Sequence, residues 1–122
     1  MAGAATVRIV ATITGLDDQV DTHVLSTMSA TPTKRAEIVQ VQATADTAEA
    51  LNLGGITTPK LIIIEAVDNA VDIDNSYVAS FSAEVKLAEG EATVLGEPGG
   101  TVYLKNNVAA ETFTVRTVIV GT

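Results

Sequence analysis

The sequence predicts an all-β protein: a β-sandwich, jelly-roll-like, with eight or nine short strands and at most one short helical turn. Three observations carry this prediction. Apolar and polar residues alternate with a period of two in most segments, which is the pattern of a half-buried strand. Turn residues recur between these segments, most clearly at Glu97-Pro-Gly-Gly100. No long helical pattern separates the strands, so a parallel sheet with crossover helices is not expected.

Two of the predicted strands meet in residues 53–74. Pro59 biases the residue before it toward an extended backbone. Residues 60–65 then form a β-branched apolar run, which is typical of a strand buried on both faces and is far too short to cross a bilayer. The chain turns at Asp68-Asn69, and residues 71–74 alternate again. We predict that these two strands form the central hairpin of the domain.

The N-terminal third continues the strand pattern. Residues 6–14 alternate apolar residues with threonine, which favours a strand, and residues 21–29 show a weaker version of the same pattern. Residues 34–44 alternate clearly, with Val39 and Val41 on one side and Ile38 on the other. Residues 45–52 have the only helix-friendly composition, and they are too short to form a stable helix, so we expect a helical turn or a loop there.

Four more strands are expected in the C-terminal half. They cover residues 77–87, 92–95, 101–105 and 111–120, separated by Gly, Pro and Asn turns. In the first of them Phe81, Ala83, Val85 and Leu87 share one face. Because no linker interrupts this succession, we expect residues 6–122 to form a single β-sandwich domain and residues 1–5 to form a flexible N-terminal arm.

Composition excludes several classes of function. The chain has 122 residues and no Cys, so disulfides and thiolate chemistry are absent. Its net charge of −8 disfavours binding to nucleic acid, which needs a basic footprint, and binding to anionic membranes. Residues 1–5 lack the charged and then apolar order of a signal peptide, so we expect synthesis in the cytoplasm.

No catalytic residue is predicted. The single histidine, His23, has no Ser or Cys nucleophile tied to it by spacing, and a lone His in a Thr-rich strand is more typical of a surface or an interface. We expect no cofactor. No Rossmann or P-loop spacing surrounds the paired glycines at Gly54-Gly55 and Gly99-Gly100.

An acidic cluster is the one candidate metal site. Glu65, Asp68, Asp72 and Asp74 offer hard oxygen ligands of the kind that calcium prefers. The stretch lacks the glycine at position six and the glutamate at position twelve of an EF-hand loop. We therefore interpret these residues as the solvent side of a strand and expect no metal, with Asp68, Asp72 and Asp74 as the candidates if a metal binds.

Two sets of residues are candidates for an interface. Tyr77 and Tyr103 make a poor carbohydrate platform without Trp, and they are better suited to packing at the sandwich edge or at a subunit contact. The small residues of the arm suit a strand laid on the exposed edge of a neighbour. The arm candidates are Ala2, Gly3, Ala4 and Ala5.

The turns and strands of residues 53–120 follow a recognisable order. The motifs are Gly-Gly-Ile at 54–56, Thr-Pro at 58–59, a buried strand at 61–64, Asp-Asn at 68–69, Val-x-Ile at 71–73, Leu-x-x-Gly-Glu at 87–91 and Val-Tyr-x-Lys at 102–105. This order resembles that of small virion proteins of tailed bacteriophages. The resemblance does not extend to the first fifty residues, and it supplies no catalytic residues.

The resemblance implies a capsid decoration (cement) protein that binds the outer shell and stabilises it. The implied partner is the major capsid protein, the implied assembly is a homotrimer, and the implied location is the capsid surface of the virion. A phage tail, baseplate or head-fibre component is the alternative within this class. A calcium- or glycan-binding β-sandwich module is the alternative from another class, and an enzyme comes last.

Overall fold

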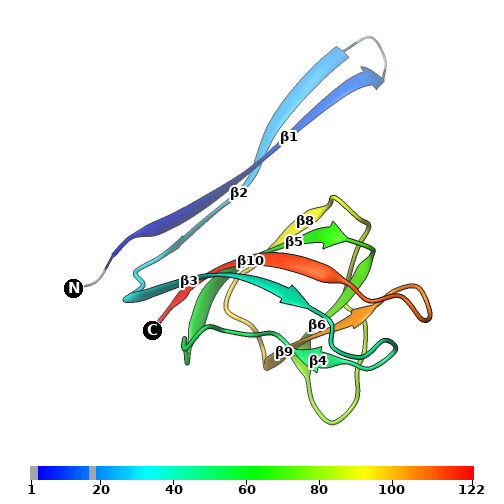
Figure 1. Cartoon of the computed structure of the whole chain (residues 1–122). Coiled ribbons are helices and arrows are strands. Elements are labelled where there is room, and N and C mark those ends of the chain that lie inside the picture. The colour runs from blue at the N-terminus through cyan, green and yellow to red at the C-terminus, as the bar shows by residue number, and fades with distance from the viewer. Residues whose placement is uncertain (1–2, 17–18) are drawn as a thin grey trace.

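The computed structural model describes residues 3–16 and 19–122, with side chains for residues 3–10 and 29–122. These residues contain ten strands and no helix, which confirms the all-β prediction (Figure 1). The strands are β1 (Ala5–Leu16), β2 (Gln19–Ala30), β3 (Lys34–Val41), β4 (Glu49–Ala50), β5 (Pro59–Asp68), β6 (Val71–Tyr77), β7 (Val85–Leu87), β8 (Ala92–Leu95), β9 (Thr101–Asn106) and β10 (Thr114–Gly121).

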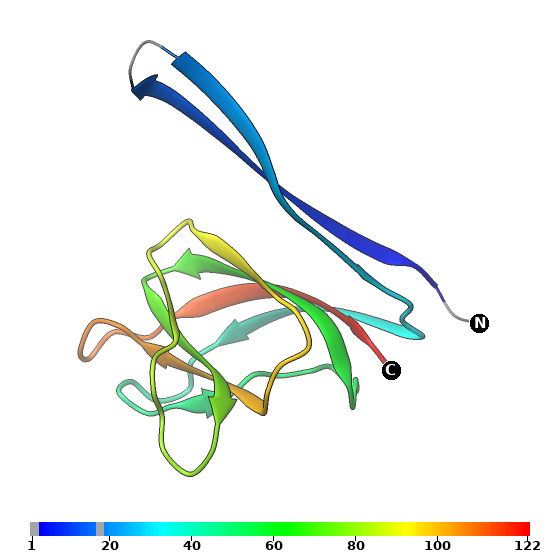
Figure 2. The ribbon, with the colours of Figure 1, turned by 180° about the vertical axis from the view of Figure 1, so that it is seen from behind.

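Eight strands form two antiparallel four-stranded sheets. The first sheet has the order β3-β10-β5-β8, and the second sheet has the order β4-β9-β6-β7. Four of the neighbouring pairs are nested about the connection between β6 and β7: β6 lies beside β7, β5 beside β8, β4 beside β9 and β3 beside β10. This nested pairing, wrapped into two layers, is the jelly-roll arrangement (Figures 1 and 2).

The two sheets enclose one aliphatic core. Ile62 and Ile64 of the first sheet and Ile73 and Leu104 of the second sheet are fully buried in the same cluster, together with Phe113. Within the apolar run of β5, only Ile63 is partly exposed. The prediction of a strand buried on both faces is confirmed for Leu61, Ile62 and Ile64, and Ile63 departs from it.

The predicted central hairpin is wrong. β5 and β6 follow each other through a tight turn at Asn69, whose φ is +62°, but they do not pair. β5 pairs with β10 and β8, whereas β6 pairs with β9 and β7. Both strands carry apolar residues that need burial, and crossing from one sheet to the facing sheet lets both bury them in the same core.

The predicted strand over residues 77–87 is also wrong in its first part. β6 ends at Tyr77, β7 begins at Val85, and residues 78–84 form a loop with one isolated bridge. Ala79 lies at φ +66°, which breaks an extended backbone. Leu87 is buried, as its alternation predicts. In residues 45–52 the structure has a loop and the two-residue strand β4, with no helix.

β1 and β2 form a two-stranded sheet of their own, here called the hairpin. They pair antiparallel from Ala5 opposite Ala30 onward, with a register shift between Ile9 and Val10. The strand predictions for residues 6–14 and 21–29 are confirmed, but neither strand joins the sandwich sheets. In both views the hairpin runs away from the sandwich (Figures 1 and 2). The base is tied to the linker before β3, because the Gly3 N–H donates to the Pro32 carbonyl at 2.7 Å.

Candidate functional site

The three candidate calcium ligands do not form a common site in the structure. The Asp74 carboxylate is only 2% exposed and accepts the backbone N–H groups of Ser76 at 3.0 Å and Ser82 at 2.9 Å. Asp72 accepts a hydrogen bond from Asn107 Nδ2 at 2.9 Å, and Asp68 is exposed at the end of β5. Among the residues with described side chains, no group of three or more His, Cys, Asp or Glu is placed to hold a metal ion.

Asp74 is instead a structural carboxylate. Burial raises its pKa, but the N–H groups of Ser82 and Ser76, with a contribution from the Glu84 side chain, outweigh burial and hold the pKa below the ordinary value of 3.8. Both oxygens of the ionised carboxylate are engaged by the backbone on either side of Ala79. The carboxylate therefore organises the loop between β6 and β7.

A second polar cluster closes the other end of the sandwich. Asn106 Nδ2 donates to Asp46 Oδ1 at 2.9 Å, and Gln42 Nε2 donates to Asn106 Oδ1 at 3.0 Å. The Asn106 hydrogen bond, and then the Ala110 N–H, lower the pKa of Asp46. These contacts join the loop after β3 to the loop after β9, so their role is to fasten the two loops together.

The two candidate tyrosines are brought together by the structure. Their rings stack with centroids 3.7 Å apart and an angle of 15° between the planes. Tyr77 ends β6 and Tyr103 lies in the neighbouring strand β9, and both side chains are half-buried. Each ring covers a face of the other, which stabilises the sheet and shields part of the surface that a ligand would need.

The arm candidates fall at the base of the hairpin. Ala2 and the His23 side chain lie outside what the structure describes. Gly3 bonds to Pro32, Ala4 is exposed, and Ala5 is the first residue of β1, where it pairs with Ala30 of the same chain.

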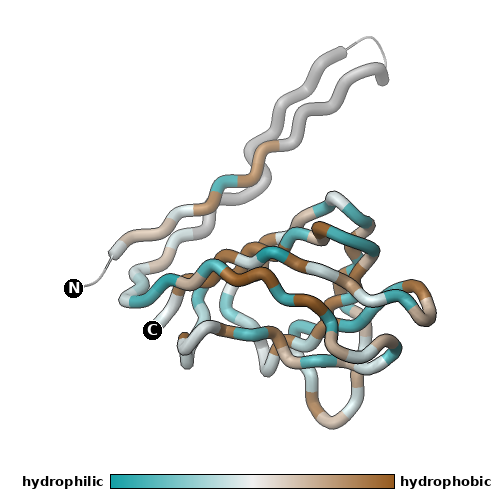
Figure 3. Tube along the Cα trace, viewed as in Figure 1, coloured by the Kyte–Doolittle hydropathy of each residue, from teal (hydrophilic) through white to brown (hydrophobic). Residues whose placement is uncertain are grey.

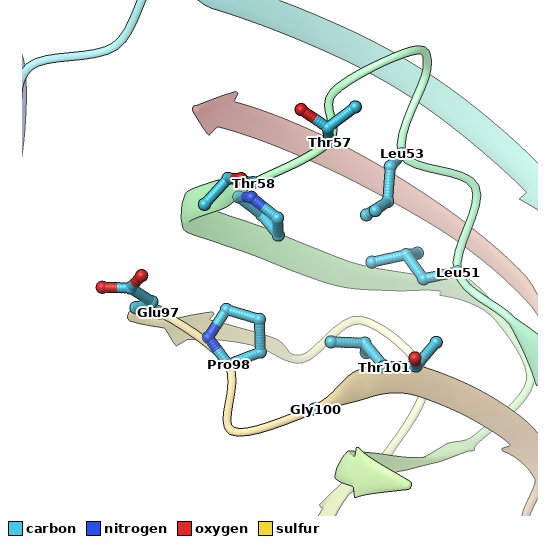
Figure 4. Close-up of a pocket in the computed structure, with 10 residues that line it drawn as sticks. Leu51, Leu53, Thr57, Thr58, Glu97, Pro98, Gly100 and Thr101 are labelled. Carbon is cyan, nitrogen blue, oxygen red and sulfur yellow. The ribbon is translucent and has the colours of Figure 1, made fainter. Parts of the chain in front are cut away.

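A hollow of about 340 Å³ opens between the loop before β5 and the loop before β9 (Figure 4). Its lining is mainly Leu, Thr and Pro, with Leu51 and Leu53 at its inner end and Glu97 at its mouth. Glu97 pairs with Lys60 at 2.8 Å. The described lining contains no His, Cys or Lys, so we find no candidate nucleophile and base pair in this hollow.

The hairpin base lies over the outer face of the first sheet. A hollow of about 320 Å³ between them is lined by alanine, threonine and aliphatic side chains. Its lining residues are Ala4, Ala5, Thr6 and Val7 of β1, Leu61 and Ile63 of β5, and Val118 and Val120 of β10. The outer face of a sandwich sheet is ordinarily polar, so this apolar strip indicates a surface that receives another element.

Strand β3 extends the same face to an open edge. Val39 is 65% exposed and Val41 is 59% exposed, whereas Gln42, on the opposite face, is 3% exposed. The predicted alternation of β3 is confirmed. Alternation alone does not say which face is buried, and hydropathy favours burying the valines, so sequence reasoning missed this exposed apolar edge.

Comparison of the chain with models of known protein families, with curated proteins and with solved structures finds no match. In the described residues there is no helix of the length and apolarity needed to cross a membrane. The features of the described structure that bear on function are the hairpin, the apolar outer face and the open edge.

Proposed function

We propose that this chain is a structural protein of a bacteriophage virion, specifically a capsid decoration protein that binds the outer shell and stabilises it. The observation that carries the proposal is the hairpin, which pairs with no sandwich strand in the described part of the chain. An isolated two-stranded hairpin is at best marginally stable in water. A ribbon with twelve residues in each strand is best accounted for by a second surface that an assembly provides.

The chemistry of the described side chains supports adhesion over turnover. Asp74 and Asp46 hold loops in place. On the outer face of the first sheet, Arg116 Nη2 donates to Glu65 Oε2 at 3.1 Å in an exposed ion pair. In these contacts the charged groups serve the fold.

The jelly roll supports the proposal by analogy of fold alone, since this architecture occurs in viral capsid proteins and also in lectins. The net charge of −8 favours a soluble protein that binds through specific contacts. In this proposal the major capsid protein is the partner, and the hairpin base and the apolar strip are the contact surfaces. A tail or baseplate location is the alternative placement of the same binding surfaces.

Binding to particles tests the proposal. We expect the chain to be detected by mass spectrometry in purified particles of the phage that encodes it, and to bind saturably to particles stripped of it. Deleting residues 2–5, which removes the Gly3–Pro32 tie at the hairpin base, is expected to lower occupancy. Val108→Ser, a change at a 48% exposed site in the loop between β9 and β10, is the control and should bind normally.

Absence of the chain from purified particles contradicts the proposed role. Unchanged occupancy after the deletion contradicts the part assigned to the N-terminal arm.

A further inference from the structure

We propose that the open edge of β3 pairs with the β3 edge of a second copy of this chain, antiparallel, across a twofold axis at Val39. This inference goes beyond the proposed function, because it concerns the isolated protein and holds whether or not the chain belongs to a virion.

The backbone of β3 is paired on one side only. The Gln42 N–H donates to the Phe113 carbonyl at 3.0 Å, and Thr117 Oγ1 donates to the Ile38 carbonyl, so the even-numbered positions direct their backbone groups toward β10. Hydrogen-bonding direction alternates along an antiparallel strand. The odd-numbered positions therefore direct their N–H and C=O groups to the open side, where the structure shows no partner for them within the described residues. These positions are Arg35, Glu37, Val39 and Val41.

This is the longest open edge of the sandwich. β3 has eight residues, whereas the other edge strands β8, β4 and β7 have four, two and three. Proteins usually protect long edges with charge, proline or a bulge. β3 carries charge only in its first half, and Val39 and Val41 in its second half are exposed. Figure 3 shows hydrophilic colour at the start of β3 and hydrophobic colour toward its end.

The two ends of the edge have opposite charge. Lys34 and Arg35 begin the strand, and Arg35 Nη2 pairs with Glu37 Oε1 at 2.7 Å, which leaves one net positive charge at this end. Just after its end, Glu49 Oε1 accepts the N–H groups of Ala43 at 2.7 Å and Thr44 at 3.1 Å, which places a carboxylate on the open side. Antiparallel pairing brings the basic start of one strand to the acidic end of the other.

A twofold axis at Val39 brings together both the exposed side chains and the open backbone groups of the two edges. It places Val39 opposite its own counterpart and diagonal to the second copy's Val41, so that the exposed valines cover one another. It also places Arg35 opposite the second copy's Ala43, beside the carboxylate of Glu49. The open N–H and C=O groups of positions 37, 39 and 41 are then paired in both copies. Self-complementary pairing of this kind is what a twofold interface requires.

The mass of the purified full chain in solution tests the proposal. We expect a concentration-dependent species of twice the chain mass of 12.6 kDa by light scattering or sedimentation. A trimer, the assembly that the phage resemblance implies, would need a head-to-tail contact and would overturn the twofold pairing. So would a species of single-chain mass up to the solubility limit.

Charge substitutions at the axis sharpen the test. Because position 39 faces itself, Val39→Lys places two like charges opposite each other, and so does Val39→Glu. Each variant is expected to weaken the dimer at least about tenfold. Mixing the two variants places Lys opposite Glu, and we expect association to return. Val78→Lys, at a 79% exposed site in the loop after β6, is the control and should dimerise as the native chain does.

Amide hydrogen exchange supplies a readout that misfolding cannot mimic. In the dimer the amides of Glu37, Val39 and Val41 are expected to gain protection with concentration, whereas those of Ile38 and Gln40 are protected at every concentration by β10. A dimer that forms without this protection, or that survives in each Val39 variant alone, would overturn the proposal.

Discussion

At the scale of single residues, the buried carboxylate of Asp74 shows how one side chain determines a loop. Strand alternation places Asp74 on the solvent side of β6, opposite Ile73. The structure covers it with the loop of residues 78–84, whose Ser82 N–H it accepts. Alternation predicts the side of the strand, but it does not reveal that a later segment folds over that side.

Replacing this carboxylate is expected to loosen the loop. Asp74→Asn keeps one acceptor oxygen and loses the charge, so we expect the free energy of unfolding at pH 7 to fall by about 1–3 kcal/mol. Urea unfolding monitored by far-UV circular dichroism measures the change. Asp68→Asn is the control, because Asp68 is exposed and its side chain has no hydrogen bond within the described residues; its effect should stay within about 0.5 kcal/mol.

The same residue makes stability depend on pH. The pKa of Asp74 in the folded chain lies below its ordinary value of 3.8. A carboxyl group with a depressed folded pKa stabilises the fold above its unfolded pKa, and this stabilisation is lost as the pH falls through the folded pKa. The difference between native and Asp74→Asn proteins should therefore be constant near neutral pH and shrink below about pH 4. A difference that grows on acidification would contradict this role.

At the scale of elements, the strands were largely predictable and their partners were not. Alternation and turn residues located β1, β3, β5 and β10, because a period of two is written in the local sequence. Pairing depends on which sheet each strand joins. Residues 60–74 contain two strands and a tight turn, which fits a hairpin equally well, and only the burial of both strands in a shared core sends them to facing sheets.

The hairpin illustrates the same limit. The alternation of residues 6–14 fits a sandwich strand as well as a free ribbon, since both have one apolar face. The difference lies in whether another sheet covers that face, which is a tertiary property. The exposed valines of β3 are not predictable for a related reason. They are exposed because the opposite face of the strand is the buried one, and Gln42 on that face is held by a hydrogen bond to Asn106 that composition does not reveal.

The junction between β10 and β5 offers a test at this scale. A Cβ added at Gly121 would lie 2.1 Å from the Thr58 carbonyl oxygen and 2.9 Å from the Pro59 Cα, both backbone atoms. Gly121→Ala therefore forces the end of β10 away from the start of β5, and we expect a loss of about 1–3 kcal/mol in thermal or urea unfolding. Gly99→Ala, whose nearest contact is Ser76 Cβ at 3.8 Å, is the control and should unfold like the native chain.

At the scale of the whole molecule, the chain combines a closed body with surfaces left open. The jelly roll buries one aliphatic core between its sheets, and its two ends are fastened by the Asp74 and Asn106 contacts. The hairpin and the β3 edge pair with no further strand in the described residues, and the apolar strip is partly covered by the hairpin base. The proposed function assigns its contacts to these surfaces.

The central claim is that this chain functions by lying against other subunits through its hairpin. An electron-microscopy reconstruction of the particle tests it most directly. We predict density for the jelly roll on the outer capsid surface, with residues 5–30 laid against a neighbouring subunit. A particle without the chain, or a bound chain whose hairpin touches nothing, would contradict the claim.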